Sequence, residues 1–198
     1  MAKGFSNGCR RLAAPLINWF AARFAAMGIT PNMITIAGIV PYLIVAWLLW
    51  NGNNIAAAVM LIIFAPLDVV DGTLARNTGQ ETPFGAFLDS TVDRIEEIIM
   101  YGALIAYFQR FHEESLLLGL IAFAALTGSL MVSYTRARAE AMGFKCDGGL
   151  LTRFERFLLF IFALLFKLYL PVLTAIAILS YFTTVQRILL VRKQAREK

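Results

Sequence analysis

Residues 55–76 read IAAAVMLIIFAPLDVVDGTLAR, and residues 85–108 read GAFLDSTVDRIEEIIMYGALIAYF. Each stretch joins a pair of aspartates to an apolar run that approaches the length needed to cross roughly 30 Å of bilayer hydrocarbon. The aspartates end the first run and begin the second, so two antiparallel helices bring both pairs to one membrane face. These residues predict two neighbouring transmembrane helices that present four carboxylates to a common cavity.

The rest of the chain has the composition of a polytopic membrane protein. Of its 198 residues, 59% are hydrophobic and only 16% are charged, and the mean hydropathy is +0.69, well above the range of ordinary soluble domains. We predict an all-α integral membrane protein with six transmembrane helices, preceded by an N-terminal interfacial helix. The predicted spans are Ile34–Trp50, Ile55–Asp71, Gly85–Phe108, Leu116–Thr135, Phe157–Phe166 and Pro171–Ile188.

The fifth span and the N-terminus need separate comment. Lys167 cuts the fifth span short, so that span needs residues 150–156 as its first turns. Residues 12–27 are apolar but interrupted by Pro15, Asn18 and Arg23, which favours an amphipathic helix in the membrane interface over a signal peptide, since no small-residue cleavage site follows. We predict one membrane domain, with the interfacial helix at 8–28, the six-helix bundle at 31–190 and a cytosolic tail at 191–198.

Basic residues define the predicted orientation. With the N-terminus in the cytosol, sixteen of the eighteen Lys and Arg residues fall on the cytosolic side, and Arg110 and Lys167 fall opposite. This bias places both termini and the aspartates at the cytosolic face of the cell membrane. The net charge of +5 then reflects topology and attraction for phosphate, and nucleic-acid binding is not expected. Cys9 and Cys146 have no C-x-x-C spacing and are interpreted as reduced thiols without a role.

The aspartate spacing predicts a metal centre. Asp68 and Asp71 are three residues apart and Asp89 and Asp93 four apart, so each pair shares one helix face. Four uncompensated carboxylates would repel one another, whereas divalent cations neutralise them. Oxygen ligands favour Mg²⁺ first and Mn²⁺ second. The competing interpretation is a proton or cation relay in a transporter.

Small residues beside the acids leave room for a ligand. Gly72 and Ala75 flank Asp71 without bulk, and Arg76, one turn further, offers a planar fork of donors to a phosphate. The pattern D-x2-D-G-x2-A-R-x8-G-x3-D-x3-D is matched at every position. Together with the run Thr30-Pro-Asn-Met-Ile-Thr35 before the first span, it resembles the CDP-alcohol phosphatidyltransferase family over essentially the whole chain.

The resemblance implies specific roles. In that family, typically homodimeric, the four motif aspartates hold two divalent metal ions on the donor pyrophosphate, and the last is also the general base. Transferred by position, the metal ligands are Asp68, Asp71, Asp89 and Asp93, with Asp93 as the base. The positions that contact the CDP-lipid donor are Pro31, Asn32, Met33, Ile34, Gly72, Ala75, Arg76 and Thr82.

A second set of basic residues concerns the acceptor. Segments 133–140, 148–156 and 186–187 resemble the branch that uses inositol phosphate, the phosphatidylinositol-phosphate and archaetidylinositol-phosphate synthases. The resemblance implies that the acceptor's phosphate contacts Arg136, Arg153 or Arg156, and Arg187. We therefore expect transfer from CDP-diacylglycerol or CDP-archaeol to the phosphorylated polyol inositol 1-phosphate, with release of CMP.

Other acceptors and functions are less well supported. Glycerol 3-phosphate would give a phosphatidylglycerophosphate synthase and needs a phosphate site too, whereas serine needs none. A purely structural scaffold would carry the intramembrane acids at a cost without use. His112, the single histidine, stands beside two glutamates in a predicted outer loop and is expected to be an ordinary surface residue.

Overall fold

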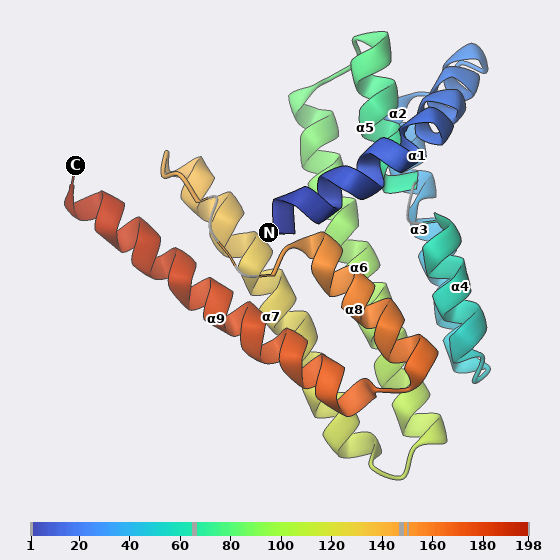
Figure 1. The fold of residues 1–198 in the computed structure, drawn as a ribbon, viewed down its shortest axis with the longest axis vertical. Helices are drawn as coiled ribbons and strands as arrows, with labels where there is room; N and C mark the ends of the chain where they lie inside the picture. Colours follow the sequence, from blue (N-terminus) through green and yellow to red (C-terminus); the bar gives the residue numbers. More distant parts are fainter. Residues whose placement is uncertain (1, 65–66, 147–148, 150, 198) are drawn as a thin grey trace.

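The computed structural model describes residues 2–64, 67–146, 149 and 151–197, and the side chains of residues 2–13, 67 and 68 lie outside that description. The described residues form nine α-helices and no strand, in agreement with the predicted all-α class (Figure 1). The helices are α1 (Ala2–Ala26), α2 (Pro31–Ala37), α3 (Ile39–Trp50), α4 (Asn54–Phe64), α5 (Leu67–Thr78), α6 (Pro83–Phe111), α7 (Ser115–Ala141), α8 (Arg153–Phe166) and α9 (Tyr169–Arg196).

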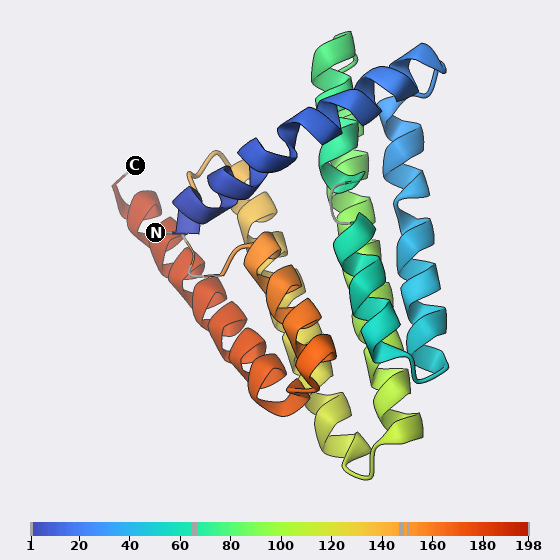
Figure 2. The same ribbon diagram turned by 45° about the vertical axis from the view of Figure 1, so that its right-hand side comes forward.

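The long helices form a bundle that α1 crosses at one end. Helix α6 packs against α3 and α7, α7 packs along α9, and α8 lies between α4 and α9. Helix α1 contacts α5 and runs across the end of the bundle where α5 and the start of α6 lie (Figure 2). The predicted aspartate pairs therefore sit at the end of the bundle that α1 covers.

Among the residues that the structure describes, four stretches are long and apolar enough to cross a membrane. They are Pro31–Trp50, Asn54–Thr78, Ser115–Ala141 and Tyr169–Arg196, and they correspond to the first, second, fourth and sixth predicted spans. Helix α6, the predicted third span, has 29 residues but carries several acids in its first half. Helix α8, the predicted fifth span, has 14 residues and rises about 21 Å, less than the roughly 30 Å of the hydrocarbon core.

Local sequence explains where the helices begin and end. Thr30 and Thr82 accept hydrogen bonds at the starts of α2 and α6, each followed by a proline in the first turn. Thr152 and Glu155 form a capping box, so α8 begins at Arg153 and not at residue 150 as expected. Lys167, in the left-handed conformation with φ of 56°, ends α8 as predicted. Residues 191–196 of the predicted tail continue α9.

Two apolar clusters hold the fold together. The larger fills the bundle with buried side chains from α3, α4, α6, α7, α8 and α9, including Tyr101, Phe108 and Phe160. The smaller consists of Ile17 and Ala21 of α1 packed against Ile34, Val70 and Leu74. Helix α1 is thus fixed directly to α2 and α5, the helices that carry the first half of the predicted site.

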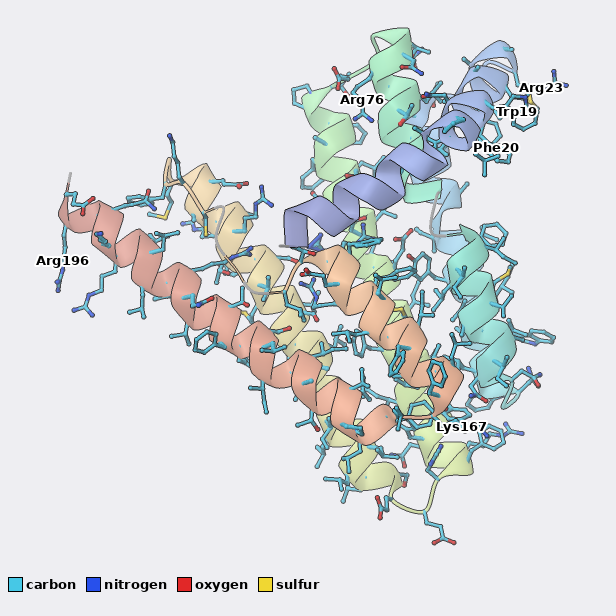
Figure 3. The ribbon with its side chains drawn as sticks, in the orientation of Figure 1. Trp19, Phe20, Arg23, Arg76, Lys167 and Arg196 are labelled. Carbon is cyan, nitrogen blue, oxygen red and sulfur yellow. The ribbon has the colours of Figure 1, made fainter. Side chains whose placement is uncertain are left out.

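Charged side chains divide between the two ends of the bundle. Figure 3 shows Arg23, Arg76 and Arg196 toward the end that α1 crosses and Lys167 at the opposite end, as the distribution of basic residues predicts. On α1, Trp19 and Phe20 point away from the bundle, with Trp19 60% exposed. An exposed tryptophan beside an arginine is typical of a helix that lies in a membrane interface.

Candidate active site

Three of the four predicted metal ligands line one small cavity. Asp71 from α5 and Asp89 and Asp93 from α6 surround it, together with Thr35 of α2. The Thr35 hydroxyl donates to Oδ2 of Asp71 at 2.7 Å, and the backbone N–H of Gly72 donates to Oδ1 at 2.6 Å. The fourth, Asp68, stands one helical turn before Asp71 in α5, and its side chain lies outside the described residues.

A larger groove of about 310 Å³ adjoins this cavity and runs between α2, α5 and α6. Six of the eight residues predicted to contact the donor line it, namely Pro31, Asn32, Gly72, Ala75, Arg76 and Thr82. Ile34 instead lines the aspartate cavity. Met33 is exposed and is not among the residues that line the groove or the cavity. Asp71 and Asp89 line both spaces, so a ligand in the groove reaches the aspartates.

Glycine and a cap explain how α6 approaches α2 at this groove. The N–H of Gly85 donates to the Thr82 hydroxyl at 2.9 Å. A Cβ atom on Gly85 would lie 3.1 Å from Thr82 Oγ1 and 3.2 Å from Asn32 Oδ1. Gly85 therefore permits close packing of α6 against α2. At Gly72 the nearest atom to an added Cβ is the mobile end of Arg76, at 3.4 Å, so the chain itself leaves that side of the groove open.

The donor set fits a hard divalent cation. Asp71, Asp89 and Asp93 direct carboxylates to one cavity, and carboxylate oxygens are the ligands that Mg²⁺ and Mn²⁺ prefer. Within residues 2–64, 67–146, 149 and 151–197, no three His, Cys, Asp or Glu side chains already form a complete ligand set. The carboxylate of Asp93 is engaged by two arginines, Arg94 and Arg153.

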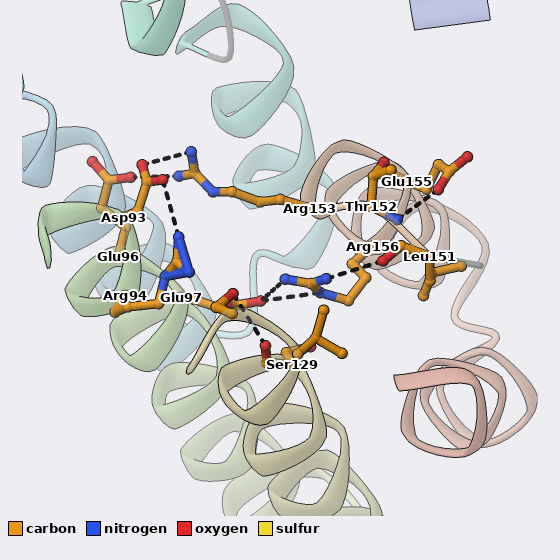
Figure 4. A network of polar contacts seen from close by, with 12 residues as sticks. Asp93, Arg94, Glu96, Glu97, Ser129, Leu151, Thr152, Arg153, Glu155 and Arg156 are labelled. Atoms are coloured by element: carbon orange, nitrogen blue, oxygen red, sulfur yellow. Dashed lines mark hydrogen bonds and ion pairs between the residues drawn. The ribbon is translucent and has the colours of Figure 1, made fainter. Parts of the chain in front are cut away.

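Arg153, at the start of α8, reaches across to Asp93 (Figure 4). Its Nη1 lies 2.5 Å from Oδ1 of Asp93, and its Nη2 lies 3.1 Å from Oε2 of Glu96. Arg94 makes a second, longer contact, 3.2 Å from Oδ2 of Asp93. The predicted base is therefore paired with one of the arginines predicted to bind the acceptor.

Arg156 has a different environment from the other predicted acceptor ligands. It is 3% exposed, and its Nη2 lies 3.4 Å from Oε1 of the buried Glu97, while its Nη1 donates to the Leu151 carbonyl at 3.3 Å (Figure 4). A buried arginine paired with a buried glutamate joins α8 to α6. The prediction named Arg153 or Arg156 as the acceptor ligand, and this geometry favours Arg153.

The two remaining predicted acceptor ligands lie near the ends of α7 and α9. Arg136 pairs with Glu140 at 2.8 Å on the surface of α7. Arg187 donates to the carbonyl of Val132 in α7. A Cβ on Gly149 would lie 3.4 Å from Arg187 Nη2 and 2.7 Å from Thr183 Cγ2. Gly149, shortly before α8, thus packs onto Arg187, which places this arginine and the start of α8 on the same side of the bundle.

His112 lies at the opposite end of α6 from the aspartates. Its ring contacts Tyr107, Phe108 and Tyr169 edge-on, with centroid distances between 5.3 and 5.4 Å. Partial burial lowers the pKa of His112 below its ordinary value, and the nearby charge of Lys167 lowers it further. It packs as an aromatic side chain away from the aspartate cavity.

Several polar residues at the site were not predicted, among them Thr35, Glu96 and Glu97. Thr35 bonds Asp71, and Glu96 and Glu97 bond the two arginines of α8. Both glutamates fall within a predicted span, where an acidic side chain is itself a functional signal, so that signal could have identified them. Thr35 is polar at the start of an apolar segment, but its partner depends on how α2 meets α5, which the local pattern does not specify.

Known proteins resemble this chain over most of its length. The chain is 37% identical to the archaetidylinositol phosphate synthase of Pyrococcus horikoshii, covering 86% of this chain and 87% of that protein. It is 35% identical to the phosphatidylinositol phosphate synthase of Corynebacterium glutamicum, covering 96% and 90%. Both names belong to the branch that the acceptor segments resemble.

Solved structures agree with the fold. The phosphatidylinositol phosphate synthase of Mycobacterium tuberculosis with CDP-DAG bound superposes with a TM-score of 0.82 at 30% identity, covering 89% of this chain and 94% of that one. A second structure of that protein, with manganese and citrate, gives 0.80 at 31% identity, covering 88% of each chain.

The family itself follows from a direct match. The model of the CDP-alcohol phosphatidyltransferase family matches residues 28–186, a range that contains the donor groove, all four motif aspartates and three of the four predicted acceptor arginines, Arg136, Arg153 and Arg156. That match agrees with the apolar helices and with the relatives just described. The chain is a multi-pass membrane enzyme that belongs to the CDP-alcohol phosphatidyltransferase family.

Proposed function

We propose that this enzyme transfers the phosphatidyl-type group of a CDP-lipid to a hydroxyl of inositol 1-phosphate and releases CMP. The observation that carries the proposal is the continuity of the donor groove with the aspartate cavity, through Asp71 and Asp89. A nucleotide in the groove would bring its pyrophosphate to the carboxylates. The CDP-DAG bound to the Mycobacterium tuberculosis relative supports this donor.

The metal belongs to the proposal as well. Asp68, Asp71, Asp89 and Asp93 would hold two divalent ions, Mg²⁺ or Mn²⁺, and the manganese in the Mycobacterium tuberculosis relative supports metal binding. When bound, such ions would neutralise charge on the pyrophosphate. Thr35 and the Gly72 N–H orient Asp71 for this task, since each bonds a different oxygen of its carboxylate.

The chain's own groups account for the transfer. The acceptor's hydroxyl oxygen forms a bond to the lipid-bearing phosphorus of the donor, and the bond from that phosphorus to the oxygen of CMP breaks. Asp93 takes the proton of the attacking hydroxyl. Arg76 and Thr82 hold the nucleotide part in the groove. Because the acceptor and donor are fixed side by side, no covalent intermediate on the protein is needed.

The acceptor's phosphate would bind between α7, α8 and α9. Arg136, Arg153 and Arg187 are the proposed ligands, because a guanidinium forks onto phosphate oxygens. Arg156 is assigned instead to the pairing of α8 with α6, because its guanidinium is buried on Glu97. The relatives named as phosphatidylinositol or archaetidylinositol phosphate synthases support inositol 1-phosphate over glycerol 3-phosphate.

The membrane arrangement completes the proposal. Six spans, including α6 and α8, and both termini in the cytosol agree with the basic residues gathered at the end that α1 crosses. Helix α1 would lie in the interface. The family resemblance suggests a homodimer, and the mass of the protein in nanodiscs would test that oligomeric state.

The test is metal-dependent release of CMP by the purified protein in lipid. CDP-diacylglycerol or CDP-archaeol is offered with inositol 1-phosphate, glycerol 3-phosphate or serine, and Asp93→Asn is the control. We expect release with inositol 1-phosphate and a loss of at least about a hundredfold in the variant. Preference for glycerol 3-phosphate would retain the mechanism and change the acceptor. Absence of release with every acceptor and donor would reject the transferase and favour a transporter.

A further inference from the structure

Glu96 lies outside the family motif yet lines the aspartate cavity. It stands one helical turn after Asp93 on α6, and it is 2% exposed. A buried carboxylate beside other carboxylates is costly unless a specific partner compensates it. The partner identifies what Glu96 does.

That partner is Arg153, which also contacts the base. Its guanidinium spans two carboxylates of α6, with Nη2 3.1 Å from Oε2 of Glu96 and Nη1 2.5 Å from Oδ1 of Asp93 (Figure 4). Both terminal nitrogens of the guanidinium are thus engaged at the same time, each by a different carboxylate. Rotation of the guanidinium about one carboxylate would release the other.

The other oxygen of the Glu96 carboxylate lies close to the junction of α2 and α3. A Cβ on Gly38, at the junction of α2 and α3, would lie 3.0 Å from Oε1 of Glu96. A larger residue at this junction would crowd the carboxylate. Glu96 thus lies between this junction and Arg153, its ion-pair partner.

The two carboxylates differ in burial. The side chain of Glu96 is 3% exposed, that of Asp93 is 14% exposed, and that of Arg153 is 35% exposed. Removing the counter-charge from the more buried group is the more unfavourable step, because water replaces it least well. Glu96 is therefore the lasting partner of Arg153, and Asp93 is the partner that a ligand can replace.

We propose that Glu96 is a positioning residue for the transfer reaction, acting through Arg153. It holds the guanidinium on Asp93 in the resting enzyme, and it keeps the guanidinium within reach when the acceptor's phosphate draws it away. This inference rests on the proposed function, in which Arg153 binds that phosphate. An acceptor that carries a phosphate then uncovers the base, whereas water does not, which limits hydrolysis of the CDP-lipid.

Glu96→Gln is the primary test. The loss of the anchor frees Arg153, so we expect the KM for inositol 1-phosphate to rise about tenfold, a change of about 1.4 kcal/mol, with kcat and the KM for CDP-lipid within about twofold. CMP release without acceptor should increase relative to transfer. Glu96→Asp, which keeps the charge, should restore part of the acceptor affinity. An unchanged acceptor KM together with an unchanged ratio of hydrolysis to transfer would overturn the proposal.

Two controls separate positioning from simpler roles. Glu97→Gln removes the neighbouring buried carboxylate, which bonds Arg156 and not Arg153, so it should lower thermal stability and leave the acceptor KM unchanged. Mn²⁺ binding, measured by calorimetry without substrates, distinguishes positioning from metal ligation. A loss of Mn²⁺ affinity in Glu96→Gln with normal acceptor affinity would make Glu96 a metal ligand and reject its positioning role.

The proposed function and this inference fail in different ways. Calorimetry of inositol 1-phosphate binding to the Mn²⁺-loaded protein, without CDP-lipid, measures the acceptor affinity that Arg153 provides, in the absence of turnover. A native enzyme that neither binds nor uses inositol 1-phosphate rejects the proposed acceptor. A native enzyme that uses it, with equal binding by Glu96→Gln, rejects the role of Glu96 alone. If Glu96→Gln does not fold, Glu96→Asp carries the test, with a smaller change in the same direction.

The pairing is also tested as a double-mutant cycle. Arg153→Lys keeps the charge but loses the fork that spans Glu96 and Asp93. If Glu96 acts through Arg153, the double variant should raise the acceptor KM no more than the larger of the two single changes. Additive increases would show that the two residues act independently and would contradict the proposal.

Discussion

The hydroxyl of Thr35 lies 2.7 Å from Oδ2 of Asp71 and joins α2 to α5 where the donor groove meets the aspartate cavity. The same hydroxyl is 3.1 Å from the Pro31 carbonyl, one turn earlier in α2. Because both atoms of this contact are buried, it fixes the direction in which the Asp71 carboxylate faces.

Thr35→Val should therefore impair metal binding. Valine has nearly the same shape but cannot donate, and a hydrogen bond to a charged group contributes about 1.5–3 kcal/mol. We expect Mn²⁺ affinity to fall about tenfold or more, measured by calorimetry. Thr35→Ser keeps the hydroxyl and should retain most of the affinity. A loss in Thr35→Ser with normal affinity in Thr35→Val would mean that the methyl group, not the hydrogen bond, matters.

Gly72→Ala tests whether the groove holds the donor. The added Cβ meets only the end of Arg76, so the fold should keep its thermal stability. It would occupy space in the groove, and we expect the KM for CDP-lipid to rise several-fold. Gly102→Ala in α6 adds the same methyl group where nothing described lies within 4 Å, and it should leave that KM unchanged.

Gly149→Ala should weaken binding of the acceptor and leave binding of the donor unchanged. Its φ is +154°, and the added Cβ would lie 2.7 Å from Thr183 Cγ2, so Gly149, Thr183 or the adjacent Arg187 must shift. We expect a rise of several-fold in the KM for inositol 1-phosphate. Gly143→Ala carries a similar backbone penalty at φ +76°, with nothing within 4 Å. Comparable acceptor KM values in the two variants would contradict the link from Gly149 to Arg187.

Arg156→Met should destabilise the enzyme more than it disturbs acceptor binding. It leaves the buried Glu97 without the charge that α8 supplies, a change that costs about 3–5 kcal/mol in buried pairs. Thermal unfolding in detergent should show a lower Tm, and Arg156→Met combined with Glu97→Met should recover part of it. If the single variant kept its Tm and lost acceptor affinity, Arg156 would be an acceptor ligand after all.

Ala21→Leu tests whether α1 supports the site from outside. Ala21 is 1% exposed where α1 packs on α5, and a larger side chain there costs about 1–3 kcal/mol or displaces α5. We expect lower CMP release although Ala21 touches no substrate group. Ala22→Leu adds the same volume on the exposed side of α1 and should have little effect.

The residues that the sequence identified well are those whose chemistry depends on local spacing. Asp89 and Asp93 belong to one helix, and so do Gly72 and Arg76, so their spacing along the helix is enough to place each pair on one face. Asp89 and Asp93 line the predicted cavity, and Gly72 and Arg76 line the groove. The apolar pattern likewise predicted all the long helices. Their ends were less accurate, because the capping box at Thr152 and the continuation of α9 to Arg196 depend on polar residues that carry no hydropathy signal.

The residues that the sequence did not identify act across helices. Thr35 meets Asp71 36 residues later, and Glu96 meets Arg153 57 residues later. Such partners depend on the packing of α2, α5, α6 and α8, which no local pattern specifies. For the same reason Arg153 and Arg156 could not be told apart in the sequence, although three residues along α8 separate a partly exposed guanidinium from a buried one.

The two ion pairs between α6 and α8 also constrain how the protein is made. Glu96 and Glu97 leave the ribosome 57 and 59 residues ahead of their arginines. Until α8 is synthesised, the basic charges that compensate these carboxylates do not exist. A chain truncated before Arg153 would therefore carry Glu96 and Glu97 without either of the ion pairs that join α6 to α8.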